Sequence, residues 1–167
     1  MRVLGIDPGT TVTGWGVVES HGSGFRHVAH GCIRTSAEDP LPERLGKIFA
    51  GICETIQLHH PAAASVEEIF VSINVQSALK LGHARGCAIA ALSSLGVPVF
   101  EYTALQVKQA MTGYGRAEKH QVQAMVKRIL AMASTPPQDA ADALAGALCH
   151  LQQKSRITLL QTHKNMS

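Results

Sequence analysis

The chain has 167 residues, of which 46% are hydrophobic and 16% charged, and its formal net charge is +3. This composition is typical of a globular protein that buries one core, and it excludes a disordered chain. The sequence has no run of about 18 or more apolar residues and no signal-peptide layout, so we expect no membrane span and a cytoplasmic location.

Three strands are predicted at the start of the chain. Residues 3–6 form a short apolar run that ends at the turn signal Asp7-Pro8-Gly9. A second strand is predicted over residues 12–18 and a third over residues 25–33, with a hairpin loop at residues 20–24 between them. Such short connections favour antiparallel pairing, so these strands should begin a sheet.

The rest of the chain alternates between helical and strand patterns. A spacing of three and four residues between apolar positions indicates helices, and short apolar runs indicate strands. In chain order we expect a helix ending near His59, a strand over 63–66, a helix over 75–94, a strand over 97–102, a helix opened by a capping box at 103–106, a helix around 122–130 and a last helix from about Asp139 to Gln153.

These elements predict one α/β domain over residues 1–154, with a mixed sheet of about five strands flanked by helices. Residues 155–167 show no clear pattern and are expected to form a flexible C-terminal tail. The glycines of Gly113-Tyr114-Gly115 should end a helix and open a mobile loop. The four cysteines and nine histidines have neither zinc-ligand nor disulfide-framework spacing.

Two candidate functional carboxylates stand at predicted strand ends. Asp7 follows the first strand, and Glu67 follows the strand over residues 63–66. Side-chain alternation places Glu67 on one face of that strand and Val66 and Glu68 on the other. The alternatives are a simple turn-forming role for Asp7 and a solvated strand-end position for Glu67.

Asp139 and Asp142 form a second acidic pair. Their spacing of three places both carboxylates on one face of the predicted last helix. Asp139 has an alternative role as a cap beside the helix N-terminus. Asp142 lies among alanines and leucines, where a buried carboxylate needs a partner, and a metal ion suits that role.

Convergence of the four carboxylates would create a site for hard divalent cations. A site of Asp and Glu without His or Cys favours Mg²⁺, with Mn²⁺ as a substitute, over zinc. Two such ions about 4 Å apart can activate a water and stabilise the leaving oxygen in phosphodiester hydrolysis. The expected cofactor is therefore magnesium, with two ions per active site.

The stretch between Ile69 and Gln138 is basic, which suits an anionic partner such as a phosphate backbone. Solvated helix faces are the alternative explanation. Only Glu101 and Glu118 are acidic there, against seven cations: Lys80, Arg85, Lys108, Arg116, Lys119, Lys127 and Arg128.

An ordered set of short motifs runs along the chain to about residue 152. It consists of Leu4-Gly-Ile-Asp-Pro-Gly-Thr10, Thr13-Gly-Trp-Gly-Val17, Gly31-Cys-Ile-Arg-Thr35, Val66-Glu-Glu-Ile-Phe70, Asn74, Ser77-Ala-Leu-Lys-Leu-Gly82, Ala84-Arg-Gly86, Val99-Phe-Glu-Tyr102, Gln106-Val-Lys-Gln109, Ala117-Glu-Lys119 and Asp139-Ala-Ala-Asp-Ala-Leu-Ala145. Together these motifs resemble those of RuvC-type Holliday junction resolvases.

The resemblance implies a ribonuclease-H-like fold and a homodimer that makes paired symmetric nicks in four-way DNA junctions during recombination and repair. The implied products are 5′-phosphate and 3′-hydroxyl ends. It also implies that Asp7, Glu67, Asp139 and Asp142 are the catalytic metal ligands, and that a branch-migration helicase complex can be a partner. Many members of the family have Gln at the position of Glu68.

The resemblance further implies that Lys108 and Lys119 contact the scissile region and that Phe70 lies near the unpaired bases. Phe70 and Tyr114 each offer a flat face for stacking on an unpaired base, although Phe70 has an equal alternative as a core aromatic. The remaining candidate DNA contacts are Arg85 and Arg116 in the basic stretch.

Two other functions stay open on the sequence. An actin- or Hsp70-like nucleotide-binding domain also opens with an Asp-x-Gly-Thr-Thr segment, but the chain has no second Asp-x-Gly-Thr segment. The second alternative is a junction-binding protein without catalysis, in which the carboxylates are structural. Cleavage of a synthetic four-way junction in magnesium separates these readings.

Overall fold

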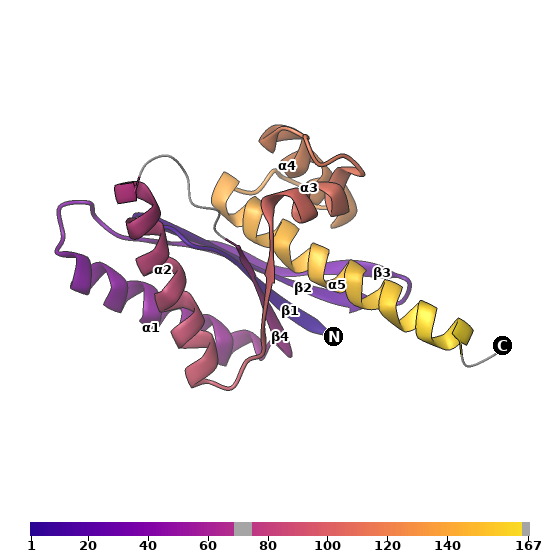
Figure 1. Ribbon diagram of the computed structural model, residues 1–167, viewed down its shortest axis with the longest axis horizontal. Coiled ribbons are helices and arrows are strands. Elements are labelled where there is room, and N and C mark those ends of the chain that lie inside the picture. The colour runs from indigo at the N-terminus through magenta and orange to yellow at the C-terminus, as the bar shows by residue number, and fades with distance from the viewer. Residues whose placement is uncertain (69–74, 165–167) are drawn as a thin grey trace.

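The computed structural model describes the backbone of residues 1–68 and 75–164 and the side chains of residues 1–68 and 75–155. Within these ranges one sheet of five strands lies between two layers of helices (Figure 1). Phe70, a candidate for base stacking, lies outside the described residues.

The sheet is mixed, as the sequence predicts. β1 pairs with β2 and β2 with β3 in antiparallel fashion, whereas β4 runs parallel to β1 and β5 runs parallel to β4. The strand order is β3-β2-β1-β4-β5. The strands are β1 (Arg2–Asp7), β2 (Val12–His21), β3 (Gly24–Arg34), β4 (Ala63–Glu67) and β5 (Val99–Tyr102).

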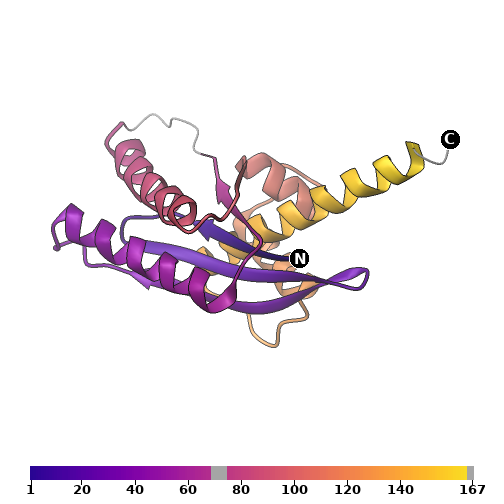
Figure 2. The same ribbon diagram turned by 90° about the horizontal axis from the view of Figure 1, so that it is seen from below.

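Helices cover both faces of the sheet, which Figures 1 and 2 show from two directions. One face carries α1 (Leu41–His59) and α2 (Val75–Ser94), and the other carries α3 (Ala104–Thr112), α4 (Lys119–Ile129) and α5 (Gln138–Lys164). None of the helices within the described ranges combines the length and the apolar character needed to cross a bilayer.

Most predicted elements are present, with two corrections. Ser20 and His21 belong to β2, so the expected hairpin loop at residues 20–24 is reduced to a tight turn between His21 and Gly24. The last helix does not end near Gln153 but continues to Lys164, because no Gly or Pro interrupts residues 154–164. Flexibility of residues 155–167 stays a prediction.

The predicted capping box at the start of α3 is confirmed. The backbone N–H of Gln106 donates to Thr103 Oγ1 at 3.1 Å, and the backbone N–H of Thr103 donates to Gln106 Oε1 at 2.8 Å. Gly113 ends the helix with a left-handed φ of 74°. These caps fix both ends of the helix that carries Lys108.

Alternation along β1 divides its side chains between two cores. Val3 packs among the buried side chains of α3, α4 and α5, whereas Leu4 and Ile6 pack against α1 and α2. Asp7 shares the alternation of Val3, so its carboxylate projects toward the face that α5 covers.

Helix α5 lies unusually close to β1 and β2, because glycines face it. A Cβ built on Gly5 would lie 1.8 Å from the carbonyl oxygen of Ala143, and one on Gly14 would lie 2.1 Å from that of Asp139. No side chain fits at either position without displacement of the helix backbone. The two glycines therefore set the height of α5, and of its aspartates, above the sheet.

Gly14→Ala is expected to lower the free energy of unfolding by roughly 1–3 kcal/mol, since it pushes the first turn of α5 off the sheet. Urea denaturation measures the change. Gly46→Ala in α1 is the matched control, because a Cβ at Gly46 meets nothing within 4 Å and alanine favours a helix. A Gly14 variant as stable as the parent would contradict this account of the packing.

Candidate active site

Three carboxylates from distant parts of the chain line one cavity of about 100 Å³. Asp7 ends β1 and Glu67 ends the neighbouring parallel strand β4, so both lie at the same edge of the sheet. Asp142 reaches the cavity from α5. The structure thus brings together three of the four carboxylates that the sequence singles out.

The fourth carboxylate, Asp139, lies one turn before Asp142 in the first turn of α5. It does not line the cavity, but its charge acts on both Asp7 and Asp142 and contributes to raising their pKa values. It therefore stands beside the cavity, within electrostatic range of the other carboxylates.

The turn after Asp7 is held by Thr13, a buried residue that the sequence reading left unassigned. Its hydroxyl donates to the carbonyl oxygen of Gly9 at 2.8 Å and lies 3.4 Å from the backbone nitrogen of Gly9, which donates to it. This pair of contacts fixes the Pro8-Gly9 turn and hence the direction in which the chain leaves Asp7. The sequence gives no signal for this role, because it depends on the burial of Thr13 and on its contacts with Gly9.

Burial and mutual repulsion disfavour the ionised form of the carboxylates in the cavity. Burial, followed by the charges of Asp142, Glu67 and Asp139, raises the pKa of Asp7 to about 7. The side chain of Glu67 is exposed at the cavity mouth, yet partial desolvation and then Asp142 raise its pKa as well. Burial also raises the pKa of Asp142. Carboxylates in this state are good partners for a cation.

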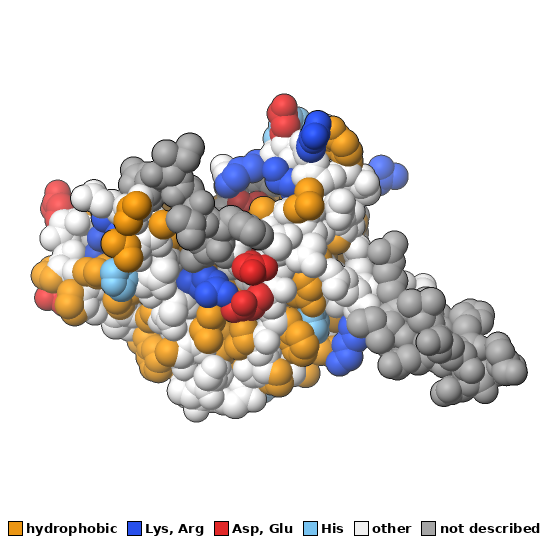
Figure 3. Space-filling model, viewed as in Figure 1, with side chains coloured by type: hydrophobic (Ala, Val, Ile, Leu, Met, Phe, Trp, Pro, Cys, Tyr) orange, Lys and Arg blue, Asp and Glu red, His pale blue; other side chains and the backbone are white. Residues whose placement is uncertain are grey.

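Two lysines face the carboxylates. Lys119 Nζ lies 3.4 Å from Asp142 Oδ2, and Lys108 lines the same cavity. Desolvation alone would lower the pKa of Lys119, but Asp142, with Asp7 and Glu67, outweighs it and raises that pKa. Figure 3 shows Lys and Arg side chains along the rim formed by α3 and α4, above a hollow with an acidic floor.

The chemistry of the cavity suits a hard cation, but its side chains do not yet enclose one. All its acidic groups are carboxylates, which Mg²⁺ and Mn²⁺ prefer. Across the described ranges, however, no three His, Cys, Asp or Glu side chains are arranged so that they could hold a metal ion. The donor set therefore fits a divalent cation in kind, although the described side chains are not arranged as a metal-binding group.

The other candidate DNA contacts within the described residues do not line the cavity, and they differ in exposure. Tyr114 and Arg116 are exposed between α3 and α4. Arg85 on α2 is engaged, since its guanidinium contacts the backbone oxygen of Glu67 and the carboxylate of Glu101. Glu68, the neighbour of Glu67, lines an adjoining cavity of about 350 Å³ that also includes Asp7, Glu67 and Lys119.

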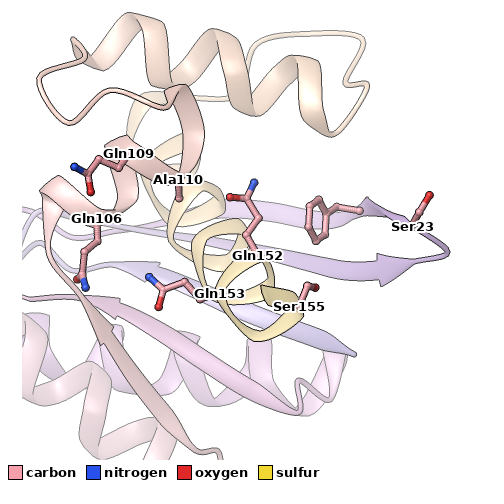
Figure 4. Close-up of a pocket in the computed structure, with 8 residues that line it drawn as sticks. Ser23, Gln106, Gln109, Ala110, Gln152, Gln153 and Ser155 are labelled. Atoms are coloured by element: carbon pink, nitrogen blue, oxygen red, sulfur yellow. The ribbon is translucent and has the colours of Figure 1, made fainter. Parts of the chain in front are cut away.

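A larger cavity, of about 440 Å³, lies away from the carboxylates between α3, α5 and the turn that joins β2 to β3 (Figure 4). The described residues that line it are uncharged, so they offer no carboxylate for a metal ion and no cationic group for a phosphate. These residues are Ser23, Phe25, Gln106, Gln109, Ala110, Gln152, Gln153 and Ser155.

Known proteins match the chain in both sequence and structure. The family model of the crossover junction endodeoxyribonuclease RuvC matches residues 3–150. RuvC of Magnetococcus marinus is 54% identical over 154 residues, which cover 92% of this chain and 86% of that protein. RuvC of Dechloromonas aromatica is 55% identical over 149 residues, with coverage of 89% and 83%.

Solved structures agree. The structure of T. thermophilus RuvC in complex with a Holliday junction substrate superposes with a TM-score of 0.85 at 42% identity, covering 90% of this chain and 93% of that one. The yeast mitochondrial resolvase Ydc2 shares the fold, with a TM-score of 0.69 at 11% identity and coverage of 98% and 85%. The chain therefore belongs to the RuvC family of crossover junction endodeoxyribonucleases, hydrolases that act on DNA and share a ribonuclease-H-like fold.

Proposed function

We propose that this Holliday junction resolvase cuts phosphodiester bonds at the cavity lined by Asp7, Glu67 and Asp142, with Asp139 beside it. The observation that carries this assignment is the meeting of Asp7, Glu67 and Asp142, each with a raised pKa, with two lysines at one edge of the sheet. The lysines are Lys108 and Lys119. Together they offer a place for cations and cationic groups for a phosphate.

Nucleases of this family depend on metal ions, and we assign Mg²⁺, two per site, with Mn²⁺ as a substitute. When bound, such ions activate the attacking water and stabilise the leaving oxygen. Asp7, Glu67 and Asp142 would hold them, with Asp139 completing the set from the first turn of α5. The raised pKa of Asp7 supports this role, since a divalent cation would offset both the desolvation cost of the buried charge and the repulsion from the neighbouring carboxylates.

The lysines act on the phosphate. Lys108 and Lys119 line the cavity from α3 and α4, where each can steady a phosphate oxygen and neutralise charge that develops as the bond breaks. The ammonium of Lys119 is held at the edge of the cavity by its pair with Asp142. In-line attack by water on phosphorus expels the 3′ oxygen and leaves 5′-phosphate and 3′-hydroxyl ends.

The outer DNA contacts follow from exposure and charge. Tyr114 offers an exposed ring beside the rim for stacking on an unpaired base, and Arg116 offers a charge for the backbone. Phe70 keeps its predicted role near the unpaired bases. A branch-migration helicase complex as partner also stays a prediction.

A homodimer would supply two such sites to a four-way junction with approximate two-fold symmetry, and paired nicks then leave ligatable duplexes. We assign the dimer contact to the outer face of α2. Val75 and Leu79 are exposed there, and a Cβ on Gly82 or Gly86 meets nothing within 4 Å. Small and apolar residues on one helix face suit close packing against a second copy.

Membership of the RuvC family sets aside the two other readings of the sequence. The match over residues 3–150 identifies an endodeoxyribonuclease and not a nucleotide-binding domain of the actin or Hsp70 class. Relatives at about 54% identity carry the name of an enzyme, which argues against a junction-binding protein without catalysis.

Metal exchange tests the mechanism. With a synthetic four-way junction, we expect paired nicks in Mg²⁺ or Mn²⁺, and junction binding without cleavage in Ca²⁺, which is larger and coordinates less rigidly. A linear duplex of the same sequence is the control and should stay intact. Denaturing gels and mobility shifts report the two activities. Cleavage that persists in a chelator would refute the metal-dependent mechanism.

A further inference from the structure

We propose that Arg85 is a positioning residue for catalysis that holds Glu67 through its backbone, and that Glu101 holds Arg85 in turn. Arg85 Nε donates to the carbonyl oxygen of Glu67 at 3.2 Å. The other side of the same guanidinium pairs with the carboxylate of Glu101. One side chain from α2 thus ties the end of β4 to β5.

The contacts of Arg85 lie at the end of β4, where they can orient Glu67. Glu67 is the last residue of β4, where strand pairing stops. On the β5 side it lies opposite Tyr102, whose carbonyl oxygen accepts from the backbone N–H of Glu68 at 2.9 Å. Arg85 adds a second tie at the carbonyl of Glu67. The peptide between Glu67 and Glu68 is therefore held from both its N–H and its C=O, which fixes the backbone from which the Glu67 side chain extends.

The pair is partly open to solvent, so we expect it to contribute little to the stability of the fold. The side chain of Arg85 is 22% exposed and that of Glu101 is 43% exposed. Ion pairs of this kind contribute about 0–1 kcal/mol to stability. Catalysis is far more sensitive, since a shift of roughly 1 Å in a reacting group can cost about 10²-fold in rate. Variants of the pair should therefore fold normally and cleave slowly.

A direct DNA contact is the competing role for Arg85, and the two roles predict opposite results. If Arg85 binds a phosphate, its charge is what matters, so Arg85→Lys should be mild and removal of Glu101 should free the guanidinium and strengthen binding. If Arg85 positions Glu67, its planar fork with Nε is what matters. The ammonium of a lysine presents its donors from one point and does not reproduce the two separate edges with which the guanidinium contacts Glu67 and Glu101.

The experiment measures single-turnover cleavage in Mg²⁺ and junction affinity in Ca²⁺ over a range of salt for Arg85→Lys, Arg85→Gln and Glu101→Ala. We expect cleavage to slow about 10–100-fold in both Arg85 variants and about 3–10-fold in Glu101→Ala. Affinity should stay within about twofold of the parent, and the dependence of log affinity on log salt should keep its slope. The double variant Arg85→Gln/Glu101→Ala should cleave no more slowly than Arg85→Gln alone, because Glu101 acts only through Arg85.

The pair of Glu19 with Arg26 is the matched control. It joins β2 to β3 away from the cavity with an Nη–Oε distance of 2.5 Å, and Glu19→Ala should leave cleavage unchanged. Normal cleavage by Arg85→Lys, or a salt slope reduced by about one in Arg85→Gln, would overturn the proposal in favour of a phosphate contact. Because the inference rests on the proposed role of Glu67, Glu67→Gln is assayed alongside. Cleavage that survives Glu67→Gln refutes the proposed site, whereas its loss together with fast Arg85 variants refutes only the positioning role.

Discussion

Replacement of Asp7 by Asn is expected to lower the rate of junction cleavage by roughly 10³-fold or more, on the order of 4 kcal/mol of transition-state stabilisation. Asp7 is the carboxylate on which the charges of the other three act, so it lies at the centre of the acidic group. Asn keeps the size of the side chain but loses the charge that attracts a divalent cation. Single-turnover cleavage of a labelled four-way junction in Mg²⁺ measures the loss.

Junction binding should survive this substitution. The candidate DNA contacts on α3, α4 and the segment between them are untouched, and removal of a negative charge does not weaken the attraction for phosphate. We expect affinity in Ca²⁺ equal to or greater than that of the parent. Glu43→Gln in the first turn of α1 is a charge-matched control that should cleave normally. An Asp7→Asn protein that cleaves within tenfold of the parent would remove Asp7 from the catalytic set.

The same substitution is expected to stabilise the metal-free protein. Burial and three neighbouring carboxylates raise the pKa of Asp7 from 3.8 to about 7, so ionisation of Asp7 opposes folding at neutral pH. A difference of this size corresponds to at most about 4 kcal/mol, and coupling among the carboxylates reduces it. We expect Asp7→Asn to raise the free energy of unfolding by roughly 2–4 kcal/mol at pH 8 in a chelator.

The pH dependence fixes the sign of this effect. Because the pKa of Asp7 is higher in the folded than in the unfolded state, its contribution to stability is fully present below about pH 4 and is lost as the pH rises through about 7. The advantage of the Asn variant should therefore be largest at pH 8 and small near pH 4.

Urea denaturation at the two pH values, with and without Mg²⁺, tests this expectation. Mg²⁺ should stabilise the parent more than Asp7→Asn, since the cation binds the folded carboxylates. A parent protein that is more stable than the variant at pH 8 in a chelator would show that ionised Asp7 does not destabilise the metal-free fold.

The order and type of the secondary structure elements follow from the sequence by local rules. Apolar spacing predicted α1, Ala- and Leu-rich composition predicted α2, and the capping box predicted the start of α3. Strand alternation predicted which side of β4 carries Glu67. These features depend on neighbours within a few residues, which a single sequence displays directly. The predicted end of α5, near Gln153, was wrong, because the absence of a clear apolar pattern does not by itself end a helix.

The four carboxylates could also be selected from the sequence, since strand ends and a helical spacing of three mark them out among twelve acidic residues. That they meet in space could not be predicted from the sequence. It depends on parallel pairing of β1 with β4 and on the close approach of α5 over Gly5 and Gly14, contacts between segments more than 50 residues apart.

The engagement of Arg85 with Glu67 and Glu101 likewise belongs to the tertiary structure. From the sequence, Arg85 is one of seven cations in a basic stretch, and nothing local distinguishes it from a phosphate contact. The fold adds the distinguishing contacts, because packing of α2 beside β4 and β5 brings its guanidinium within hydrogen-bond distance of a strand end. The sequence by itself thus determined which residues were chemically able to act, and three-dimensional packing decided which of them meet.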